Sequence, residues 1–303
     1  MKAPTLLLML MLLLSACAGG AGQVCALQPV GVLPVRLIGN VPVTVVGINE
    51  HPAALILDIG SDITLLSRAA AVRLGVRFDD RLAIRLNGAG GQASASPAVL
   101  PDVQFGTALL RDVRAVVGRG LRPPIDGVLG INVLAGFELD LDAPKGEVAL
   151  YRARPPACAG VPPPWTVPFV RLPTEQERSG HLFIPATLNK QPIRALLDTG
   201  ASRSTVGLPA AAAAGLTAAD LLRGPSSVTQ SLDAAGIITR PRRFRSLQIG
   251  DDAVDDPVLN VADLPPQAGD MIIGSDYLSS RRIWIALASG TMFASIPDQP
   301  RPR

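Results

Sequence analysis

Residues 57–61 read Leu-Asp-Ile-Gly-Ser, and residues 197–201, 140 positions later, read Leu-Asp-Thr-Gly-Ala. An apolar run precedes each aspartate, and the glycine two residues after it permits a tight turn. Each aspartate is therefore expected to leave a buried strand and enter a loop. Because the flanks of the two stretches also match, the chain is predicted to contain one structural unit twice.

The matching flanks extend the repeat well beyond the two aspartates. At an offset of 140, the matched pairs are Asn49 and Asn189, Pro52 and Pro192, and Gly75 and Gly215. At an offset of 144, they are Gly106 and Gly250, Asp126 and Asp270, Gly130 and Gly274, and Leu134 and Leu278. The second unit is therefore four residues longer between Gly215 and Gly250. An aspartate followed by glycine is common in ordinary turns, but the matched repeat favours a functional pair.

A proline-rich stretch separates the two units. Five prolines lie between Arg154 and Trp165, and proline interrupts β ladders and favours a stiff, extended connection. We therefore expect a first lobe at residues 28–154, a linker at 155–165 and a second lobe at 166–297. Each lobe has the usual size of a domain.

The periodicity of the chain is mainly that of strands. Helices are expected to be few and short: Ser67 caps one that ends at Gly75, and Pro209 opens another that ends at Gly215. Each unit is thus predicted to be a small β barrel or sandwich with minor helices. Large aliphatic residues recur at every second position, as in strands, at residues 81–86, 138–142 and 283–287.

Composition excludes several classes of protein. The 303 residues are 48% hydrophobic and 17% charged, which is typical of a globular protein. The net charge is only +3, and the basic run at residues 240–245 fits a solvated strand face better than a phosphate contact, so no nucleic acid partner is expected. His51 and His181 are the only histidines and lack metal-ligand spacing, so each is expected in a solvent-facing turn, with no metal or cofactor. No G-x-S-x-G motif of a serine hydrolase is present.

The first residues have the pattern of an export signal. Lys2 precedes nine apolar residues, Leu6 to Leu14, which are too few to span a bilayer. The following Leu14-Ser15-Ala16-Cys17 resembles the bacterial lipobox, in which a peptidase cuts before a cysteine that carries diacylglycerol. Residues 1–17 are thus predicted to be a signal peptide and Cys17 a lipid anchor on the periplasmic face of a bacterial membrane. Ordinary cleavage after Ala18, which would give a soluble periplasmic or secreted protein, is the alternative.

Export implies an oxidising compartment, in which the two remaining cysteines can form a disulfide. Cys25 precedes the first unit and Cys158 follows it, so a bridge between them would tie the ends of that unit together. Such a bridge requires their Cα atoms to come within reach, which the sequence leaves open.

Downstream of each aspartate lies an element of two apolar residues and a glycine, Val128-Leu129-Gly130 and Ile272-Ile273-Gly274. With the Asp-Thr-Gly-Ala stretch and the duplication, these elements make the sequence resemble the retropepsin and pepsin clan of aspartic proteases over nearly the whole mature chain. The resemblance implies a bilobal fold in which two homologous β-barrel lobes meet about a pseudo-twofold axis and each donates one aspartate. It also implies a monomer whose lobes form an intramolecular pseudo-dimer. Dimerisation with a second chain is the less economical alternative.

In this family two carboxyl groups share a proton, because they cannot both ionise when held a few ångströms apart. One then acts as general base on a water while the other polarises the scissile carbonyl of a peptide or protein substrate. The resemblance assigns these roles to Asp58 and Asp198, with Gly60 and Gly200 allowing the loops to approach. Ser61 is expected to hydrogen-bond the outer oxygen of Asp58, which would make the two halves chemically unequal.

Ile59 departs from the family pattern, which has threonine or serine at this position. The family hydroxyl reaches across the axis to brace the opposite loop, so Thr199 retains only its own half of the exchange. The change removes no catalytic carboxylate, and an active endopeptidase remains our main hypothesis. A peptide-binding module that keeps the cleft but has impaired catalysis is the alternative.

Two further features have both a functional and an ordinary interpretation. The glycine-rich stretch Asn87-Gly88-Ala89-Gly90-Gly91 lies where the family has a flap, and residues 231–236 hold the equivalent place in the second unit, although a plain surface hairpin has the same pattern. No equivalent of the pepsin flap tyrosine is evident, which favours the retropepsin side. Asp126 and Asp270 are expected to accept hydrogen bonds from backbone donors in a turn, and not to form a second dyad.

Overall fold

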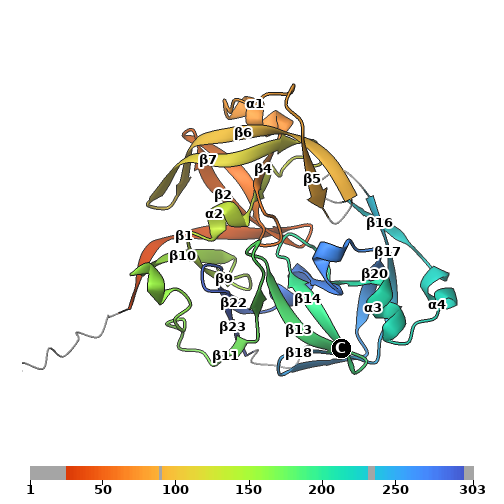
Figure 1. The fold of residues 1–303 in the computed structure, drawn as a ribbon. Coiled ribbons are helices and arrows are strands. Elements are labelled where there is room, and N and C mark those ends of the chain that lie inside the picture. Colours follow the sequence, from red (N-terminus) through yellow and green to blue (C-terminus); the bar gives the residue numbers. More distant parts are fainter. Residues whose placement is uncertain (1–24, 89–90, 231–235, 297–303) are drawn as a thin grey trace, which may run out of the picture.

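The structure, a computed structural model, describes residues 25–88, 91–230 and 236–296. It is mainly β, and Figure 1 shows the strands of the first unit, coloured orange to yellow, above those of the second, coloured green to blue. The predicted signal peptide at residues 1–17 and the predicted lipidation site Cys17 lie outside the described residues. None of the helices in the described ranges is long and apolar enough to cross a membrane.

The first lobe is a closed barrel. Its strands pair in the order β2-β3-β8-β4-β7-β6, and β6 returns to β2 through the pairs Gly47–Gln104 and Ile48–Val103. Closure leaves the barrel without a free edge. The elements of this lobe are β2 (Val41–Ile48), β3 (His51–Leu57), β4 (Thr64–Ser67), α1 (Arg68–Arg73), β5 (Ile84–Gly88), β6 (Gly91–Phe105), β7 (Ala108–Gly118), β8 (Gly127–Leu129) and α2 (Ile131–Leu134).

The second lobe repeats this plan. In both lobes the strand before the aspartate runs parallel to the apolar-apolar-Gly strand, with Leu57 opposite Leu129 and Leu197 opposite Ile273. The elements are β12 (Glu175–Gln176), β13 (Leu182–Leu188), β14 (Gln191–Leu197), β15 (Thr205–Gly207), α3 (Leu208–Ala213), α4 (Ala218–Leu222), β16 (Ser227–Gln230), β17 (Gly236–Arg243), β18 (Ser246–Ile249), β19 (Asp252–Asp255), β20 (Val258–Ala262), η2 (Pro266–Ala268), β21 (Met271–Ile273) and α5 (Ser275–Leu278).

Helix α4 lies in the stretch where the second unit is longer, and it was not predicted. Its N-terminus is a capping box: Thr217 Oγ1 accepts a hydrogen bond from Asp220 N, and Asp220 Oδ2 accepts one from Thr217 N. This reciprocal pair satisfies two backbone donors that a helix start leaves without partners. The threonine and the aspartate three residues later were the sequence signal for this helix.

The repeated polar residues of the barrels have matching structural roles. Asn49 and Asn189 adopt positive φ at hairpin tips, and their side-chain amides donate to Leu74 O at 2.9 Å and to Ala214 O at 2.7 Å. These acceptors are the C-cap residues of α1 and α3, whose carbonyls otherwise lack intrahelical donors. Each asparagine thus ties its hairpin to the end of a helix.

Asp126 and Asp270 also have matching roles, and both accept hydrogen bonds from backbone donors as predicted. Asp126 Oδ2 accepts from Ala54 N, and Asp270 Oδ2 accepts from Arg194 N, both at 2.9 Å. Their own backbone N–H groups donate to the carbonyls of the same two residues. Each aspartate therefore extends the parallel ladder beside the strand that leads to the site.

A third group of strands joins the two lobes and was not predicted. Its order is β11-β23-β22-β9-β10-β1, so it combines segments from both units. At its centre β9 pairs antiparallel with β22, and Asp140, opposite Trp284, is also the residue that the 144-residue offset relates to Trp284. The pseudo-twofold axis thus passes through this pair. The bounds are β1 (Ala26–Ile38), β9 (Glu138–Asp142), β10 (Glu147–Arg154), β11 (Phe169–Leu172), β22 (Arg282–Ala286) and β23 (Thr291–Ser295).

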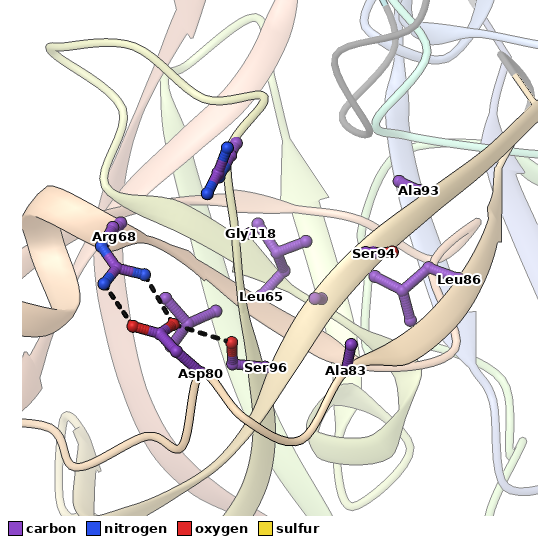
Figure 2. Close-up of a pocket in the computed structure, with 12 residues that line it drawn as sticks. Leu65, Arg68, Asp80, Ala83, Leu86, Ala93, Ser94, Ser96 and Gly118 are labelled. Atoms are coloured by element: carbon purple, nitrogen blue, oxygen red, sulfur yellow. Dashed lines mark hydrogen bonds and ion pairs between the residues drawn. The ribbon is translucent and has the colours of Figure 1, made fainter.

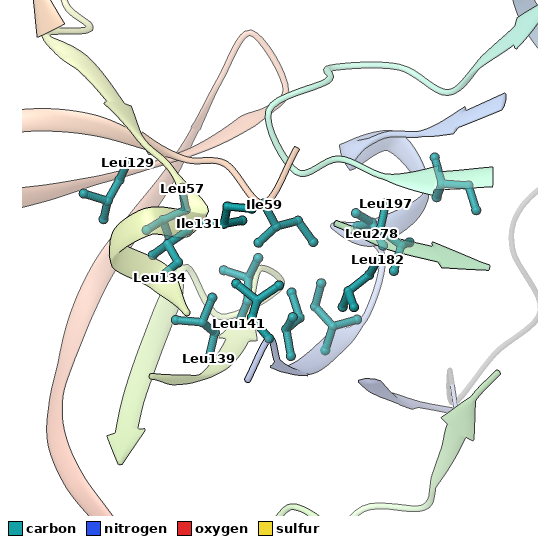
Figure 3. Packing of buried hydrophobic residues seen from close by; sticks show 14 of the residues in the cluster. Leu57, Ile59, Leu129, Ile131, Leu134, Leu139, Leu141, Leu182, Leu197 and Leu278 are labelled. Carbon is teal, nitrogen blue, oxygen red and sulfur yellow. The ribbon is translucent and has the colours of Figure 1, made fainter. Parts of the chain in front are cut away.

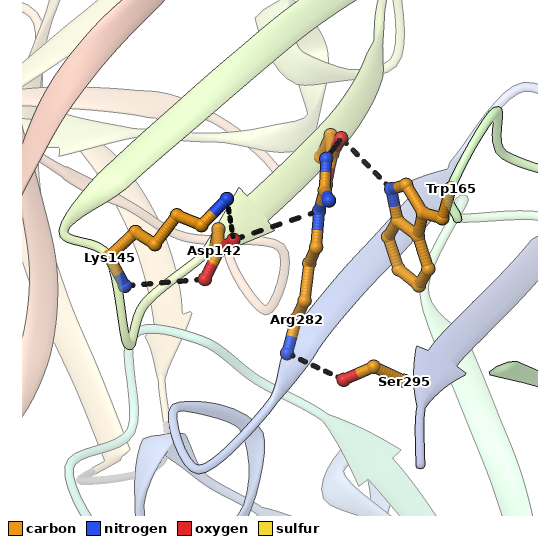
Figure 4. Close-up of polar contacts among 6 residues, drawn as sticks. Asp142, Lys145, Trp165, Arg282 and Ser295 are labelled. Atoms are coloured by element: carbon orange, nitrogen blue, oxygen red, sulfur yellow. Dashed lines mark hydrogen bonds and ion pairs between the residues drawn. The ribbon is translucent and has the colours of Figure 1, made fainter. Parts of the chain in front are cut away.

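The acidic side chains of β9 are buried in this shared sheet. Asp140 accepts hydrogen bonds from Trp165 Nε1 at 3.0 Å and from the Arg282 guanidinium at 2.8 and 2.6 Å. Figure 4 shows the two donors, Trp165 and Arg282. Glu138 accepts from Gly160 N at 2.8 Å and from Trp284 Nε1 at 2.7 Å, and its burial raises its pKa. These bonds satisfy carboxylates that would otherwise be costly to bury.

The proline-rich linker is held against this sheet and is not simply extended. It contains a short 3-10 turn, η1 (Pro156–Cys158), and Gly160 and Trp165 at its end donate to the carboxylates of β9. Cys158 forms a disulfide with Cys25, with a Cα–Cα distance of 5.5 Å and a sequence separation of 133 residues. The bridge joins the linker to the segment before the first lobe.

We predict that the disulfide stabilises the fold substantially, because it closes a long loop and restricts the unfolded chain. Cys25→Ser and Cys158→Ser should each lower the free energy of unfolding by about 2–5 kcal/mol, measured by urea denaturation under oxidising conditions. The double variant should lose the same amount as either single variant. A clearly larger loss in the double variant would show that the thiols act separately.

Candidate active site

Asp58 and Asp198 occupy equivalent places at the ends of β3 and β14. Asp58 N donates to Leu129 O at 3.1 Å, and Asp198 N donates to Ile273 O at 3.0 Å. Since these acceptors belong to the paired apolar-apolar-Gly strands, each aspartate is fixed by the same ladder. Asp58 is buried, and Asp198 is partly exposed.

Each aspartate lies against the glycine of the opposite loop. A Cβ atom at Gly60 would stand 2.4 Å from Asp198 Cγ, and one at Gly200 would stand 2.4 Å from Asp58 Cγ. Any side chain at either position would therefore overlap the opposite carboxyl group. The predicted approach of the two loops through these glycines agrees with this geometry.

The two carboxyl groups interact with each other and differ in the backbone N–H groups that donate to them. Asp58 Oδ1 accepts from Gly60 N at 2.8 Å. Asp198 Oδ1 accepts from Gly200 N at 2.8 Å and also from Ala201 N at 3.0 Å. Asp198 thus has the better hydrogen-bonded position for a negative charge.

This difference separates the two acidities. Burial, followed by the negative charge of Asp198 and the hydrogen bond to it, holds the pKa of Asp58 well above its usual range. Burial also raises the pKa of Asp198, but the hydrogen bonds from Asp58, Gly200 and Ala201 and the charge of His181 oppose that rise. The geometry therefore favours a proton on Asp58 and a negative charge on Asp198.

Ser61 does not contribute as predicted. Its hydroxyl donates to Ile63 O at 3.1 Å, two residues along its own loop. A hydroxyl has one proton to donate, and such local bonds to the backbone are typical of serine in turns. The prediction that Ser61 hydrogen-bonds the outer oxygen of Asp58 is therefore wrong. The two halves are unequal because the backbone N–H of Ala201 donates to Asp198 and because the charge of His181 lowers the pKa of Asp198.

Thr199 links the two loops across the lobe boundary. Its hydroxyl donates to Leu57 O at 2.6 Å and accepts a hydrogen bond from Ile59 N at 3.1 Å. The bonds therefore hold the backbone on both sides of Asp58. The Thr199 hydroxyl thus donates one hydrogen bond and accepts another across the lobe boundary.

Ile59 occupies the place that would mirror Thr199, and it packs into a hydrophobic cluster. Only 1% of its surface is exposed. Figure 3 shows its side chain among leucines and isoleucines from both lobes. The same asymmetry continues in the next layer, where Ser275 Oγ donates to Thr199 O at 2.9 Å while Ile131 holds the equivalent position in the first lobe. One half of the junction is hydrogen-bonded, and the other is apolar. The neighbours labelled with Ile59 are Leu57, Leu129, Ile131, Leu134, Leu139, Leu141, Leu182, Leu197 and Leu278.

The predicted flap segment forms a hairpin. Strands β5 and β6 pair antiparallel from Ile84–Ala95 to Gly88–Gly91, with Asn87 opposite Gln92. Ala89 and Gly90, which would form the tip, lie outside the described residues. In the second lobe β16 and β17 form the equivalent hairpin, whose tip at 231–235 is likewise outside them.

A cavity of about 520 Å³ lies between the β5–β6 hairpin and strands β4 and β7. Figure 2 shows Leu86 and Ala93 of the hairpin on one side, the Arg68–Asp80 ion pair on the other and Leu65 between them. Arg119, at the end of β7, also lines it and has no hydrogen bond or ion pair in the described part of the chain. The remaining lining residues are Ala83, Ser94, Ala95, Ser96, Val117 and Gly118.

The two histidines differ from each other in position. His51 is exposed at the start of β3. His181 is not in a solvent-facing turn as predicted: only 13% of its side chain is exposed, and its Nε2 lies 3.4 Å from Asp62 Oδ1 of the other lobe. The sequence pattern missed this position because the turn that precedes β13 packs against the first lobe. Within the described ranges, no three His, Cys, Asp or Glu residues are grouped so that they could hold a metal ion.

Comparisons with known proteins support the same assignment of fold and family. The family described as "Aspartyl protease" matches residues 41–133 and 184–277, one match in each unit. Among solved structures, the chain resembles an aspartic proteinase from Irpex lacteus with a TM-score of 0.54 and 12% identity, over 88% of this chain and 97% of that one. Such a low identity supports the fold alone. None of the curated proteins matches the chain. The predicted bilobal fold is confirmed.

We predict that Thr199 contributes more to stability than its apolar counterpart Ile59. Thr199→Val should leave Leu57 O and Ile59 N buried without partners and lower the free energy of unfolding by about 2–4 kcal/mol. Ile59→Val, which removes one methylene-sized group from the cluster, should cost about 1 kcal/mol. Urea denaturation measures both, and equal losses would contradict a bridging role for the Thr199 hydroxyl.

Proposed function

The chain belongs to the aspartyl protease family, which both of its units match, and on this premise we propose that it is an aspartic endopeptidase. In this proposal Asp58 and Asp198 form a catalytic dyad that hydrolyses peptide bonds of an extended peptide or protein bound between the lobes. The observation that carries the proposal is the contact of each carboxyl group with the glycine of the opposite loop. That contact brings two acids of different acidity to one place.

The proton arrangement of the dyad suits the hydrolysis of an amide. Asp198, as the carboxylate, takes a proton from a bound water while the water oxygen attacks the scissile carbonyl carbon. Asp58, which holds the shared proton, donates a hydrogen bond to the carbonyl oxygen and stabilises the charge that develops there. The proton on Asp198 then passes to the leaving amine, and the tetrahedral carbon collapses to a carboxylic acid. No covalent intermediate is needed.

The hairpin and the cavity suit the binding of a substrate side chain. Leu65 follows the loop that carries Asp58, so the cavity adjoins that loop through β4. Its apolar lining comes from both the barrel and the hairpin, and its rim carries Arg68 and Arg119. Arg68 is paired with Asp80; Arg119, whose charge also acts on Asp80, makes no hydrogen bond or ion pair within the described residues. We infer that this subsite favours a side chain with an apolar stem and an acidic end.

A peptide-binding module without hydrolysis is the second candidate function. Ile59 favours it, because the family hydroxyl is missing from one side of the junction. The tight packing of Ile59 and the bonds of Thr199 argue for the enzyme, since both keep the loops in place. Digestion of an unbiased peptide library separates the two, because a module would bind peptides without cutting them.

The location proposed for the enzyme is the periplasmic face of a bacterial membrane. The export-signal pattern at residues 1–17 and the lipobox-like Leu14 to Cys17 support this proposal. The Cys25–Cys158 disulfide suits the same oxidising compartment. A soluble periplasmic or secreted form would follow if Cys17 is not acylated. The chain is proposed to act as a monomer, because its two lobes supply both aspartates.

We predict that each dyad aspartate is required for hydrolysis. Asp58→Asn and Asp198→Asn should each reduce kcat/KM by about 10²–10⁴-fold or more, since each removes one of the two acid–base groups. Library digestion at acidic and neutral pH, with and without an aspartic protease inhibitor, measures the effect. The surface variant Asp102→Asn serves as control and should retain full activity.

Thermal unfolding of the same variants checks that the fold is intact. Both asparagine variants should unfold at or above the temperature of the wild type, because removing one of two adjacent carboxyl groups relieves their repulsion. Substantial hydrolysis by either folded variant would refute the shared-dyad mechanism.

We predict that Arg119 determines a preference for acidic side chains in the hairpin subsite. In the wild type, a peptide with glutamate at the residue that enters this subsite should be cut faster than its glutamine counterpart. Arg119→Gln should reduce that preference by roughly fivefold to tenfold, equivalent to about 1–1.4 kcal/mol. Arg111→Gln, at the other end of β7, is the matched control and should keep the preference. An unchanged preference in Arg119→Gln would exclude this role.

A further inference from the structure

Equivalent turns of the two lobes differ in one side chain at the lobe boundary. In the first lobe Asn40 has a φ of 67°, and its Nδ2 donates to Ser202 O of the second lobe at 2.6 Å. Gly180 stands at the equivalent position of the second lobe, with a φ of 95°. The second turn therefore keeps the positive φ of the first but has no side chain to reach the opposite loop.

A cavity of about 330 Å³ lies beside Gly180, between the two lobes. The turn of the second lobe lines one side of it, and Asp62 and helix α2 of the first lobe line the other. A Cβ atom at Gly180 would meet Ile131 Cδ1 of α2 at 3.2 Å. The loop that carries Asp62 corresponds to the loop that carries Ser202, since each of these residues follows a dyad aspartate by four positions. The cavity thus lies where the asparagine amide bridges turn and loop on the other side of the junction.

Asp62 gives this cavity a negative charge. Of the described residues that line the cavity, it is the one with an ionisable side chain, and 70% of that side chain is exposed. The nearest basic group is His181 Nε2, which lies 3.4 Å from Asp62 Oδ1. That nitrogen has no hydrogen-bond partner among the described residues, so the contact is not a hydrogen bond. The Asp62 carboxylate therefore retains its capacity to accept hydrogen bonds from a ligand.

The amide groups that line the cavity have their donors in use. Gln176 Nε2 donates to two backbone carbonyls of its own lobe, and Asn132 Nδ2 donates to Arg114 O at 2.8 Å. The lining thus offers a carboxylate and other oxygen acceptors, with no cationic side chain among its described residues. Such a lining suits a positively charged hydrogen-bond donor and disfavours an anion.

We propose that this junction cavity binds a guanidinium or alkylammonium group, whose N–H donors pair with the Asp62 carboxylate. The group belongs either to a basic side chain of a bound peptide or to a free small cation. Ile131 N donates to Ser61 O at 2.9 Å, so the cavity adjoins the loop that carries Asp58. Binding of the group does not require hydrolysis, whereas its assignment to a substrate side chain rests on the proposed function.

The test with a free cation uses N-acetyl-arginine amide as the probe and N-acetyl-citrulline amide as its control. The two compounds have nearly the same shape and differ in charge. Isothermal titration calorimetry with the folded, disulfide-bonded protein should show saturable binding of the arginine compound at millimolar concentrations. The citrulline compound should bind at least about fivefold more weakly, because it cannot form the charge-assisted hydrogen bond.

Two variants test the cavity itself. Asp62→Asn should weaken binding of the arginine compound by about threefold to tenfold, because it removes the charge and keeps the shape. Gly180→Asn should abolish binding, because it places in the cavity the side chain that the first lobe has at Asn40; asparagine tolerates a positive φ. Glu50→Gln changes an exposed acid at the turn between β2 and β3, and as the matched control it should bind like the wild type.

The test with peptides distinguishes a substrate side chain from a free cation. A single arginine is placed at successive positions of one peptide, and each peptide is compared with its citrulline counterpart. Binding is measured to Asp58→Asn, which is expected not to cut the peptides, and to the same variant with Asp62→Asn added. A preference for arginine at one position that disappears with Asp62→Asn assigns the group to a substrate. Binding of the free compound that depends on Asp62, without such a preference in peptides, assigns it to a free cation.

The proposal is overturned if neither the free compound nor any peptide shows a preference for arginine that depends on Asp62. An equal weakening in Glu50→Gln would overturn it as well, since a general attraction of cations to surface carboxylates would then suffice. If the wild type cuts no peptide, the proposed function fails, but both binding measurements still test the cavity.

Discussion

Two carboxyl groups that lie side by side in a buried site repel each other unless they share a proton, and the rest of this structure serves to hold them there. Each is pressed against the glycine of the opposite loop, so a small shift of one lobe would separate them. The lobes are prevented from shifting by a sheet built from both, in which β9 and β22 pair along the pseudo-twofold axis. The buried carboxylates of β9 bind the linker to that sheet, and the disulfide joins the linker to Cys25, immediately before β1. The unfavourable free energy of this repulsion is therefore offset by contacts far from the dyad.

The junction beneath the dyad holds its geometry with two different kinds of interaction. Thr199 contributes two hydrogen bonds, and each is worth roughly 0.5–1.5 kcal/mol when made and about 1–3 kcal/mol when a buried partner is left without it. Ile59 makes neither bond but is fully buried among apolar side chains, which contributes about 1.5–3 kcal/mol relative to an exposed position. The two sides are thus comparable in magnitude. Replacement of the family hydroxyl by isoleucine changes how the loop is held more than how firmly it is held.

The repeat in the sequence was sufficient to predict two similar units with an aspartate loop in each, and the resemblance to aspartic proteases added that Asp58 and Asp198 meet. It worked because matched glycines, asparagines and aspartates serve backbone geometry, and both copies of a backbone must be built in the same way. The shared sheet was not predictable from the sequence. The alternating residues at 138–142 and 283–287 indicate strands, but they do not indicate which strands pair with each other. The predicted hydrogen bond from Ser61 to Asp58 was wrong for a related reason. Which of several nearby acceptors a hydroxyl bonds depends on interatomic distances, and these cannot be read from the sequence. His181 was missed because its burial comes from the other lobe.

The proposed reaction depends on the differences between the two copies more than on their similarity. A strictly symmetric junction would give its two carboxyl groups equal environments, and neither would be preferred as base. In this chain the second lobe supplies the Ala201 N–H to Asp198, whose pKa the charge of His181 also lowers, while the first lobe buries Asp58 more deeply. Each of these differences lowers the acidity of Asp58 relative to that of Asp198, so they act in the same direction. Covalent connection of the lobes allows them to accumulate, because a residue that changes in one lobe need not change in the other.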